Sequence, residues 1–235
     1  MNDVYPDQAP SLLTVILDTN PLAWALLEDT LPLSSAVANV LVFINAHLAS
    51  NYTNKYRPFR VIESELVSNL NALLSSTTEA SLSATTSTHV AGALTLALSY
   101  INRLSMLYND SYIPIMNAVF ACQRLNIPID ILQIGLPGSD SSSCRSSAAE
   151  ENATVFLQQA SDATSGIFIP FTLSIPSSSS SSSSTKTMAS QSLLTYLLTA
   201  FVTSPLTRQY LTPPTAINVD FRAACFCHRR VIDLG

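Results

Sequence analysis

The chain has 235 residues, of which 47% are hydrophobic and only 11% are charged, and its formal net charge at pH 7 is −5. This size allows one large domain with a sizeable core, and the hydrophobic fraction excludes a globally disordered chain. The five glycines and eleven basic residues are scattered. They make no P-loop, no GxGxxG fingerprint, no GxSxG elbow and no basic run of the kind used in direct nucleic-acid binding.

The first half of the chain is predicted to begin with a buried strand. Residues 11–17 (SLLTVIL) are a short apolar run, and the polar sequence from Asp18 to Pro21 is typical of a turn. A helix is predicted to open at Pro32 and Ser34, and another lies within 61–74. The apolar residues that recur on one face of the first helix are Val37, Val40, Leu41, Ile44 and Leu48.

The second half alternates helices with two further strands. The strands are predicted over 127–136 and 167–171, where apolar residues dominate. The serine run 177–184 predicts a flexible insertion, which extends over 177–187. Helical periodicity is found over 88–105, 113–125, 150–162 and 191–202.

This order of elements predicts an α/β fold. Strands that alternate with amphipathic helices favour a doubly wound, mostly parallel sheet with helices on both faces. Ligands of such sheets bind beyond the carboxyl ends of the strands, which is where Asp18 would lie. One interpretation is that Asp18 takes part in a Mg²⁺ site. The other is that it caps the turn by accepting hydrogen bonds from nearby backbone amides.

Trp24, the only tryptophan, lies in the same first loop. Exposed aromatic side chains at such rims often anchor a partner protein. The alternative is that the indole covers the end of the sheet. The sequence leaves both roles open.

Several segments resemble one known family. They are LLTVILDTNPLAW, AVANVLVFINAHLASNYTNK, AGALTLALSYINR, IPIMNAVFACQRLNIPIDILQIG, FLQQASDATSGIFIPF and the closing VDFRAACFCHRRVIDLG. Together they resemble a von Willebrand factor A domain and, more narrowly, the family of the thirty-four-kilodalton subunit of transcription factor IIH (TFIIH). The resemblance implies a von Willebrand A-like domain over 11–222.

The resemblance also implies a metal site that has been lost. Von Willebrand A domains bind a metal ion through Asp-x-Ser-x-Ser, a Thr from a second loop and an Asp from a third. Asp18 matches the first Asp and Thr88 the Thr, whereas Asn20 and Leu22 replace the two serines. Asp110 is a poor match to the last Asp. The family pattern therefore implies a degraded site, and no cofactor is expected in this chain.

The C-terminal segment resembles the start of a zinc module, over 223–235. The run Ala-Ala-Cys-Phe-Cys-His contains Cys225, Cys227 and His228, and in the family it leads into paired Cys-x-x-Cys motifs, which would follow Gly235. Zinc is therefore expected in the full-length family member. These three residues cannot close a four-coordinate site by themselves. The alternative is a short segment that packs on the domain.

Two departures from the family concern its sheet. The family has strands after Asn54-Lys55 and ahead of Asp110. Here Lys55 runs almost directly into Tyr56, and only a short stretch separates Arg103 from Asp110. Strands are therefore expected to be missing near 55–60 and 103–112. A domain without central strands would expose apolar edges and aggregate, which favours missing sequence over a pared-down sheet.

The resemblance implies a non-enzymatic scaffold subunit of TFIIH, acting in the nucleus in RNA polymerase II transcription and nucleotide excision repair. Its expected partners are the other core subunits, above all the larger von Willebrand A-type subunit, through that subunit's cysteine-rich zinc domain. No direct contact with nucleic acid or membrane is expected. The alternatives are a metal-dependent ligand-binding A domain outside TFIIH and a doubly wound enzyme, which would need catalytic groups at the strand ends.

Overall fold

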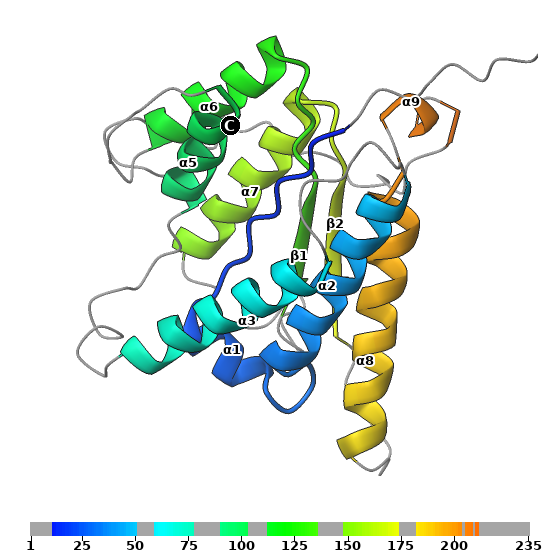
Figure 1. Cartoon of the computed structure of the whole chain (residues 1–235). Coiled ribbons are helices and arrows are strands. Elements are labelled where there is room, and N and C mark those ends of the chain that lie inside the picture. The colour runs from blue at the N-terminus through cyan, green and yellow to red at the C-terminus, as the bar shows by residue number, and fades with distance from the viewer. Residues whose placement is uncertain are drawn as a thin grey trace, which may run out of the picture. The chain divides into compact units, whose positions relative to one another are not determined.

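The computed structural model describes residues 11–50, 59–77, 90–102, 112–135, 148–173, 182–203, 205–208 and 210–211 (Figure 1). By its internal contacts the chain divides into two compact units. Unit 1 consists of Met1–Thr88 and Ser182–Val202, and unit 2 consists of His89–Ser181 and Thr203–Gly235. The expected domain over 11–222 thus spans both units, and its boundary at 222 lies outside the described residues.

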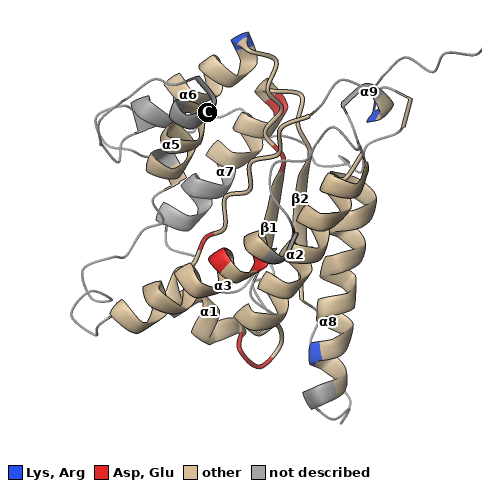
Figure 2. Ribbon diagram, in the orientation of Figure 1, with Lys and Arg blue, Asp and Glu red and all other residues tan. Residues whose placement is uncertain are grey.

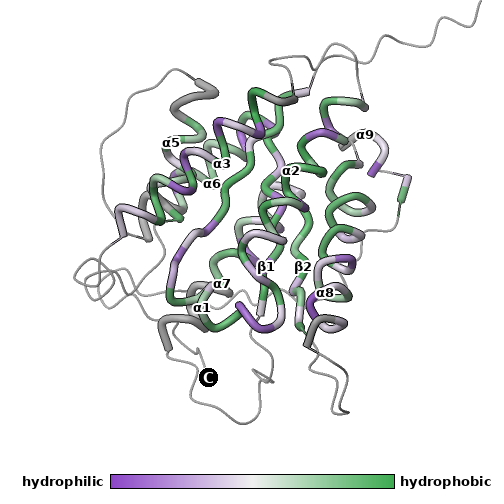
Figure 3. The backbone as a smooth tube through the Cα atoms, turned by 60° about the horizontal axis from the view of Figure 1, so that its bottom comes forward, coloured by the Kyte–Doolittle hydropathy of each residue, from purple (hydrophilic) through white to green (hydrophobic). Residues whose placement is uncertain are grey.

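Unit 1 is built from helices in the part described. They are α1 (Pro21–Leu27), α2 (Leu33–Ser50), α3 (Phe59–Ser76) and α8 (Ser182–Tyr196), which continues as the π-helical turn η2 (Leu197–Phe201). Helix α2 packs against α8 and η2, and hydrophobic residues dominate α2 and the C-terminal part of α8 (Figure 3). The buried side chains on these elements are Ala36, Val37, Phe43, Ala189, Leu193 and Leu197.

One polar link joins the two long helices of unit 1. Asn39 lies on the buried face of α2 and is only 7% exposed. Its amide nitrogen donates to the backbone oxygen of Ser190 over 2.8 Å and to the Ser190 hydroxyl over 3.1 Å. A buried amide is tolerated when its hydrogen bonds are made, so Asn39 fixes the position of α2 along α8.

Helix α2 also meets a composition test for membrane spans. It has 18 residues with a mean hydropathy of 1.4, so its length and composition would allow it to cross a bilayer. The core helix of a water-soluble protein passes the same test, and a single such helix is weak evidence for a span.

Unit 2 contains a small parallel sheet. Its elements are α5 (Val90–Asn102), α6 (Tyr112–Arg124), β1 (Ile131–Gly135), α7 (Ala148–Ala163), β2 (Phe168–Thr172) and α9 (Pro205–Arg208). β1 and β2 pair in parallel, with Ile131 opposite Phe168 and Gly135 opposite Thr172. Helix α7 connects them, as parallel strands require a crossover.

The register of β1 and β2 decides at which edge of the sheet a further strand can pair. The N–H of Ile131 donates to the oxygen of Ile167 over 2.7 Å, so odd-numbered residues of both strands direct their backbone groups toward each other. Pro170 falls on the outward side of β2, where its missing N–H costs no ladder bond. On the other edge, the backbone groups of Leu132 and Ile134 point away from β2. Both residues have a backbone N–H that can donate to a further strand.

The apolar core of unit 2 lies between its helices and the chain that leads into β1. Leu98, Ala118 and Cys122 are buried, and Ile127 and Ile129 pack against them together with Leu94 and Ala121. Burial raises the pKa of the Cys122 thiol above its usual value. The thiol is therefore a small apolar side chain of the core.

Two similar turns carry the chain from a helix into a strand. After α6, Asn126 has φ 53°, and the N–H of Ile127 donates to the oxygen of Cys122 over 2.9 Å. After α7, Ser165 has φ 56°, and the N–H of Gly166 donates to the oxygen of Ser161 over 2.8 Å. Both are Schellman-type helix ends, which need one residue in the left-handed region.

Ser165→Gly is expected to stabilise unit 2. A left-handed conformation costs a residue with a side chain roughly 1–2 kcal/mol, part of which is offset by the larger unfolded-state entropy of glycine. A net gain of about 0.5–1 kcal/mol is expected, measured as a higher midpoint in urea unfolding. Asn126→Gly is the matched control, and its gain should be smaller because asparagine tolerates this region. A loss of stability in Ser165→Gly would contradict the argument.

Most elements predicted from periodicity are confirmed, with shifted ends. The helices predicted from Ser34 and over 61–74 correspond to α2 and α3, and those over 88–105, 113–125 and 150–162 correspond to α5, α6 and α7. The strands predicted over 127–136 and 167–171 contain β1 and most of β2, and they are parallel as predicted. The mixed α/β class is thus confirmed, with helices predominating in the described part.

The predicted strand over 11–17 is wrong. Residues 11–20 belong to no strand or helix, and the described sheet consists of β1 and β2. The segment is not buried either, since Leu12 is 64% and Ile16 44% exposed. An apolar run favours a strand only where a neighbouring strand completes its backbone hydrogen bonds, and the described part of unit 1 offers helices.

Two further predictions are corrected at the ends of unit 1 helices. Helix α1 occupies residues predicted only as a turn, although Asn20 and Pro21 are typical of a helix start. The predicted flexible insertion over 177–187 is wrong from Ser182 onward, because α8 begins there; residues 177–181 lie outside the described part. Serine costs only a few tenths of a kcal/mol in a helix, so the packing of Ala189 and Leu193 outweighs it.

Candidate functional site

The loop around Asp18 is ordered by two successive side-chain caps. The Asp18 carboxylate oxygen Oδ1 accepts a hydrogen bond from the N–H of Asn20 over 3.0 Å. The Asn20 oxygen Oδ1 accepts from the N–H of Leu22 over 3.1 Å, which makes Asn20 the N-cap of α1. The interpretation that Asp18 caps the turn is therefore confirmed. Both residues satisfy backbone donors that would otherwise be left open at a helix start.

The same loop offers few further ligands for a metal ion. The side chain of Leu22 supplies no oxygen and is 51% exposed. Thr88 and Asp110, the other residues of the family pattern, lie outside the described residues. Within the described ranges, no three His, Cys, Asp or Glu side chains gather closely enough to hold a metal. The degraded metal site at Asp18, Asn20 and Thr88 stays a prediction.

The Trp24 side chain is buried within unit 1. Its side chain is 8% exposed, and its indole Nε1–H donates to the backbone oxygen of Asp18 over 2.7 Å. Leu27 and Leu31 nearby in sequence are 5% and 0% exposed. The indole thus ties α1 to the loop before it. A role as a partner anchor would need exposed area, and this role stays a prediction.

The C-terminal residues that resemble the start of the family's zinc module lie outside the described residues. Cys225, Cys227 and His228 all follow residue 211, the last one that the structure describes. The zinc module over 223–235 therefore also stays a prediction.

The structure reveals a polar cluster that sequence reasoning missed, where the two strands of unit 2 begin. Asp130 Oδ1 accepts from the N–H of Ile167 over 2.9 Å, and the Asp130 carboxylate pairs with Arg208 on α9. Thr164 Oγ1 accepts from the N–H of Ile129 over 3.0 Å. One signal was present: Asp130 is the single charge in the apolar run IPIDILQIG, and a charge there needs a partner.

The described basic side chains are dispersed. Arg124 lies on α6, Lys186 on α8 and Arg208 on α9, and Figure 2 shows no cluster of blue among the coloured residues. The acidic side chains are less evenly spread, since Asp18, Glu28, Asp29, Glu63 and Glu65 all belong to unit 1. Over the described part, the basic side chains therefore form no patch of the kind used to bind nucleic acid.

Comparison with known proteins decides the family. The model of the family described as "Transcription factor Tfb4" matches residues 10–56, 50–111 and 107–235, which together cover almost the whole chain. The chain belongs to the transcription factor Tfb4 family. It is 32% identical to "General transcription and DNA repair factor IIH subunit tfb4" of Schizosaccharomyces pombe, in an alignment that covers 97% of this chain and 82% of the relative.

Other members of the Tfb4 family are similar over the same extent. The chain is 30% identical to the subunit TFB4 of Yarrowia lipolytica, over 97% of this chain and 80% of the relative. It is 29% identical to the subunit TFB4 of Arabidopsis thaliana, over 98% of this chain and 82% of the relative. The match thus includes residues that lie outside the described part of the structure.

The comparisons also bear on the two expected gaps in the sheet. The three pieces of the Tfb4 match meet at residues 50–56 and 107–111, next to the places near 55–60 and 103–112 where strands are expected to be missing. The alignment with the Schizosaccharomyces pombe subunit spans 279 positions, at least 44 more than the 235 residues of this chain. That relative therefore has residues within the aligned region that have no counterpart here.

Proposed function

We propose that the chain is a non-enzymatic scaffold subunit of general transcription and DNA repair factor IIH. Its role would be in RNA polymerase II transcription initiation and nucleotide excision repair, in the nucleus. Membership of the Tfb4 family carries the proposal, since the matched relatives are named as subunits of this factor. A subunit of an assembly needs surfaces that recognise its neighbours, and it need not catalyse a reaction itself.

We also propose that the α/β core is of the von Willebrand A type, doubly wound and mostly parallel. The chain order β1, α7, β2, with the two strands parallel, supports this, because such sheets are built from strand–helix–strand units. The backbone N–H groups of Leu132 and Ile134 lie on the outer edge of β1, so a further strand can pair with β1 on that side. Pro170 opposes growth beyond β2.

The partner would be the larger von Willebrand A-type subunit of factor IIH, through its cysteine-rich zinc domain. A stable interface of standard size buries about 1,600 Å² in total. The low charge of this chain, 11% of residues, favours an interface held by apolar contact and neutral hydrogen bonds. Such an interface depends little on ionic strength.

The purified chain is expected to capture the zinc-loaded partner domain in a pull-down without added Mg²⁺. Binding should survive EDTA treatment of this chain alone, but it should fail when the partner has lost its zinc, because small zinc domains unfold without metal. Raising the salt concentration moderately should weaken binding little. Absence of a complex with the zinc-loaded partner would contradict the scaffold proposal.

A matched pair of variants separates the scaffold from the alternative, a metal-dependent ligand-binding A domain outside factor IIH. Asp18→Asn keeps an oxygen that can accept from the N–H of Asn20 but removes the charge that Mg²⁺ prefers. Asp29→Asn, in the turn after α1, is the control. Both should bind the partner like the original chain. Binding that needs Mg²⁺ and is lost in Asp18→Asn alone would favour the metal-dependent alternative.

A further inference from the structure

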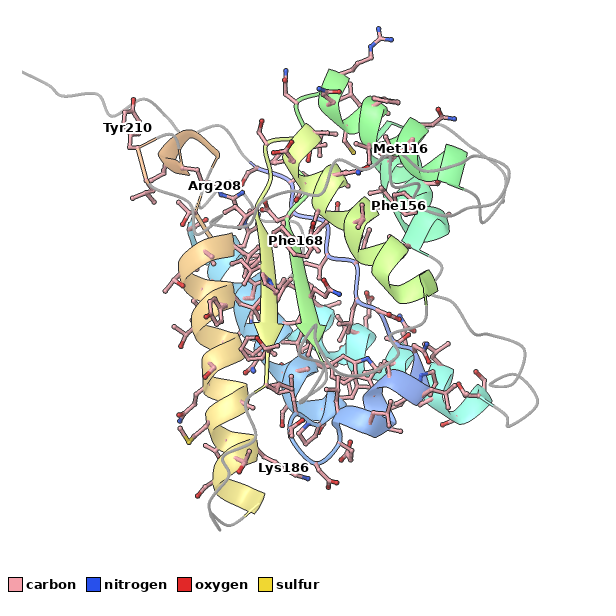
Figure 4. The ribbon with its side chains drawn as sticks, turned by 180° about the vertical axis from the view of Figure 1, so that it is seen from behind. Met116, Phe156, Phe168, Lys186, Arg208 and Tyr210 are labelled. Carbon is pink, nitrogen blue, oxygen red and sulfur yellow. The ribbon has the colours of Figure 1, made fainter. Side chains whose placement is uncertain are left out.

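The segment after η2 is tied to the beginning of both strands in unit 2. Arg208 Nη1 donates to Asp130 Oδ1 and Nη2 donates to Oδ2, each over 2.7 Å. Because Asp130 Oδ1 also accepts from the N–H of Ile167, one carboxylate joins α9, the start of β1 and the residue before β2. Figure 4 labels Arg208 at α9, near the ends of the two strands where they begin.

The pair has the geometry of a strong contact. Two parallel N–H···O bonds between a guanidinium and a carboxylate are short, charge-assisted and specific in direction. The Arg208 side chain is 14% exposed and that of Asp130 23%, so solvent and salt screen the pair less than a surface pair. Arg208 Nε also donates to the backbone oxygen of Thr203 over 3.0 Å, which closes the segment on itself.

Helix α9, which carries Arg208, is too short to be stable by itself. Helix α9 has only 4 residues, and an isolated helical turn is not stable in water because its nucleation is unfavourable. The backbone continues in turns, with the N–H of Tyr210 donating to the oxygen of Thr207 and that of Leu211 to the oxygen of Arg208, both over 3.1 Å. Tyr210 is 88% and Leu211 54% exposed, so these side chains add little burial. Figure 4 shows Tyr210 directed away from the strands.

We propose that Asp130 and Arg208 form a latch that holds α9 at the start of β1 and β2. When the latch is closed, the Arg208 guanidinium is occupied by Asp130 and the bond between Arg208 and Gln209 is protected from proteases. When it opens, α9 separates from the strands while β1 and β2 stay paired. The latch is independent of the factor IIH assignment.

Trypsin gives a direct test, because it cleaves after arginine and must take the free guanidinium into its pocket. The new N-terminus at Gln209 is quantified by mass spectrometry and compared with cleavage after Arg124 on α6. Asp130→Asn keeps an oxygen for the N–H of Ile167 but loses the charge. Cleavage after Arg208 is expected to rise at least tenfold in this variant, which corresponds to about 1.4 kcal/mol of opening free energy.

Two further variants make the result decisive. Arg208→Lys keeps the protease site and the charge but loses the two-pronged pairing, so it should also be cleaved faster while leaving Asp130 intact. Asp162→Asn, an exposed acid at the end of α7, should behave like the original chain. Hydrogen exchange of the Ile131 N–H, which pairs with Ile167, reports whether the sheet survives.

The expected result is faster cleavage after Arg208 in both latch variants, with the protection of the Ile131 N–H unchanged. Equal cleavage in the original chain and both variants would overturn the proposal. It would also be overturned if Arg208→Lys lost the protection of Ile131, because the pair would then be a part of the sheet's stability and no separate latch.

Discussion

Gly166→Ala is expected to destabilise unit 2 by about 3–5 kcal/mol, at the upper end of single-residue effects. A Cβ atom at this position would lie 1.9 Å from the backbone oxygen of Ile129 and 2.6 Å from its carbonyl carbon. Neither atom belongs to a flexible side chain, so the end of α7 or the chain leading into β1 would have to move. That chain is also held by the bond from the Ile129 N–H to Thr164.

The loss should be measured by urea unfolding followed by circular dichroism. Since a domain has only about 5–15 kcal/mol of stability in total, the variant is expected to be partly unfolded at 37 °C. Gly92→Ala is the matched control: it lies within α5 and a Cβ there meets nothing within 4 Å. It should stabilise the chain by about 0.5–1 kcal/mol, because alanine favours a helix. A Gly166→Ala variant as stable as the original chain would contradict the packing described at Ile129.

Asn39→Asp is expected to cost about 3 kcal/mol and to separate α2 from α8. The new side chain has the same shape, but its ionised carboxylate has no N–H to donate to the oxygen of Ser190. It would instead bring a negative charge against a carbonyl oxygen at a position only 7% exposed. A buried charge without a partner is far more costly than a lost neutral hydrogen bond.

Asn69→Asp provides the control for this variant. Asn69 is exposed on α3, so the same chemical change should alter the stability by no more than about 0.5 kcal/mol. Thermal unfolding of both variants at pH 7 gives the comparison. Equal melting temperatures for Asn39→Asp and Asn69→Asp would mean that the bond from Asn39 to Ser190 does not hold the two helices together.

Local patterns in the sequence predicted much of what is local in the structure. The helical faces of α2 and α7 and the apolar runs of β1 and β2 depend on residues a few positions apart, so periodicity locates them. The cap by Asp18 is equally local, because its acceptor and the donor at Asn20 are two residues apart. Helix α1 could have been predicted from Asn20 and Pro21, which are a typical N-cap and first helical residue.

The predictions were wrong where the conformation of a residue depends on packing against residues far away in the sequence. The run over 11–17 has strand composition, but composition does not say whether a neighbouring strand will complete its hydrogen bonds. The start of α8 was missed because polyserine has no apolar period, whereas Ala189 and Leu193 are buried in unit 1. Whether a weak helix former becomes helical is decided by such packing more than by its propensity.

By itself, then, the sequence determined the α/β class, the parallel strand–helix–strand order and the resemblance to the TFIIH subunit family, which rest on local periodicity and on ordered motifs. Only the tertiary structure decided which polar residues pair in partly buried positions. Asn39 and Ser190 are 151 positions apart, and Asp130 and Arg208 are 78 apart. The physical reason is that a buried polar group is stable only when its partner arrives from elsewhere in the chain, and no local pattern records which distant residue that will be.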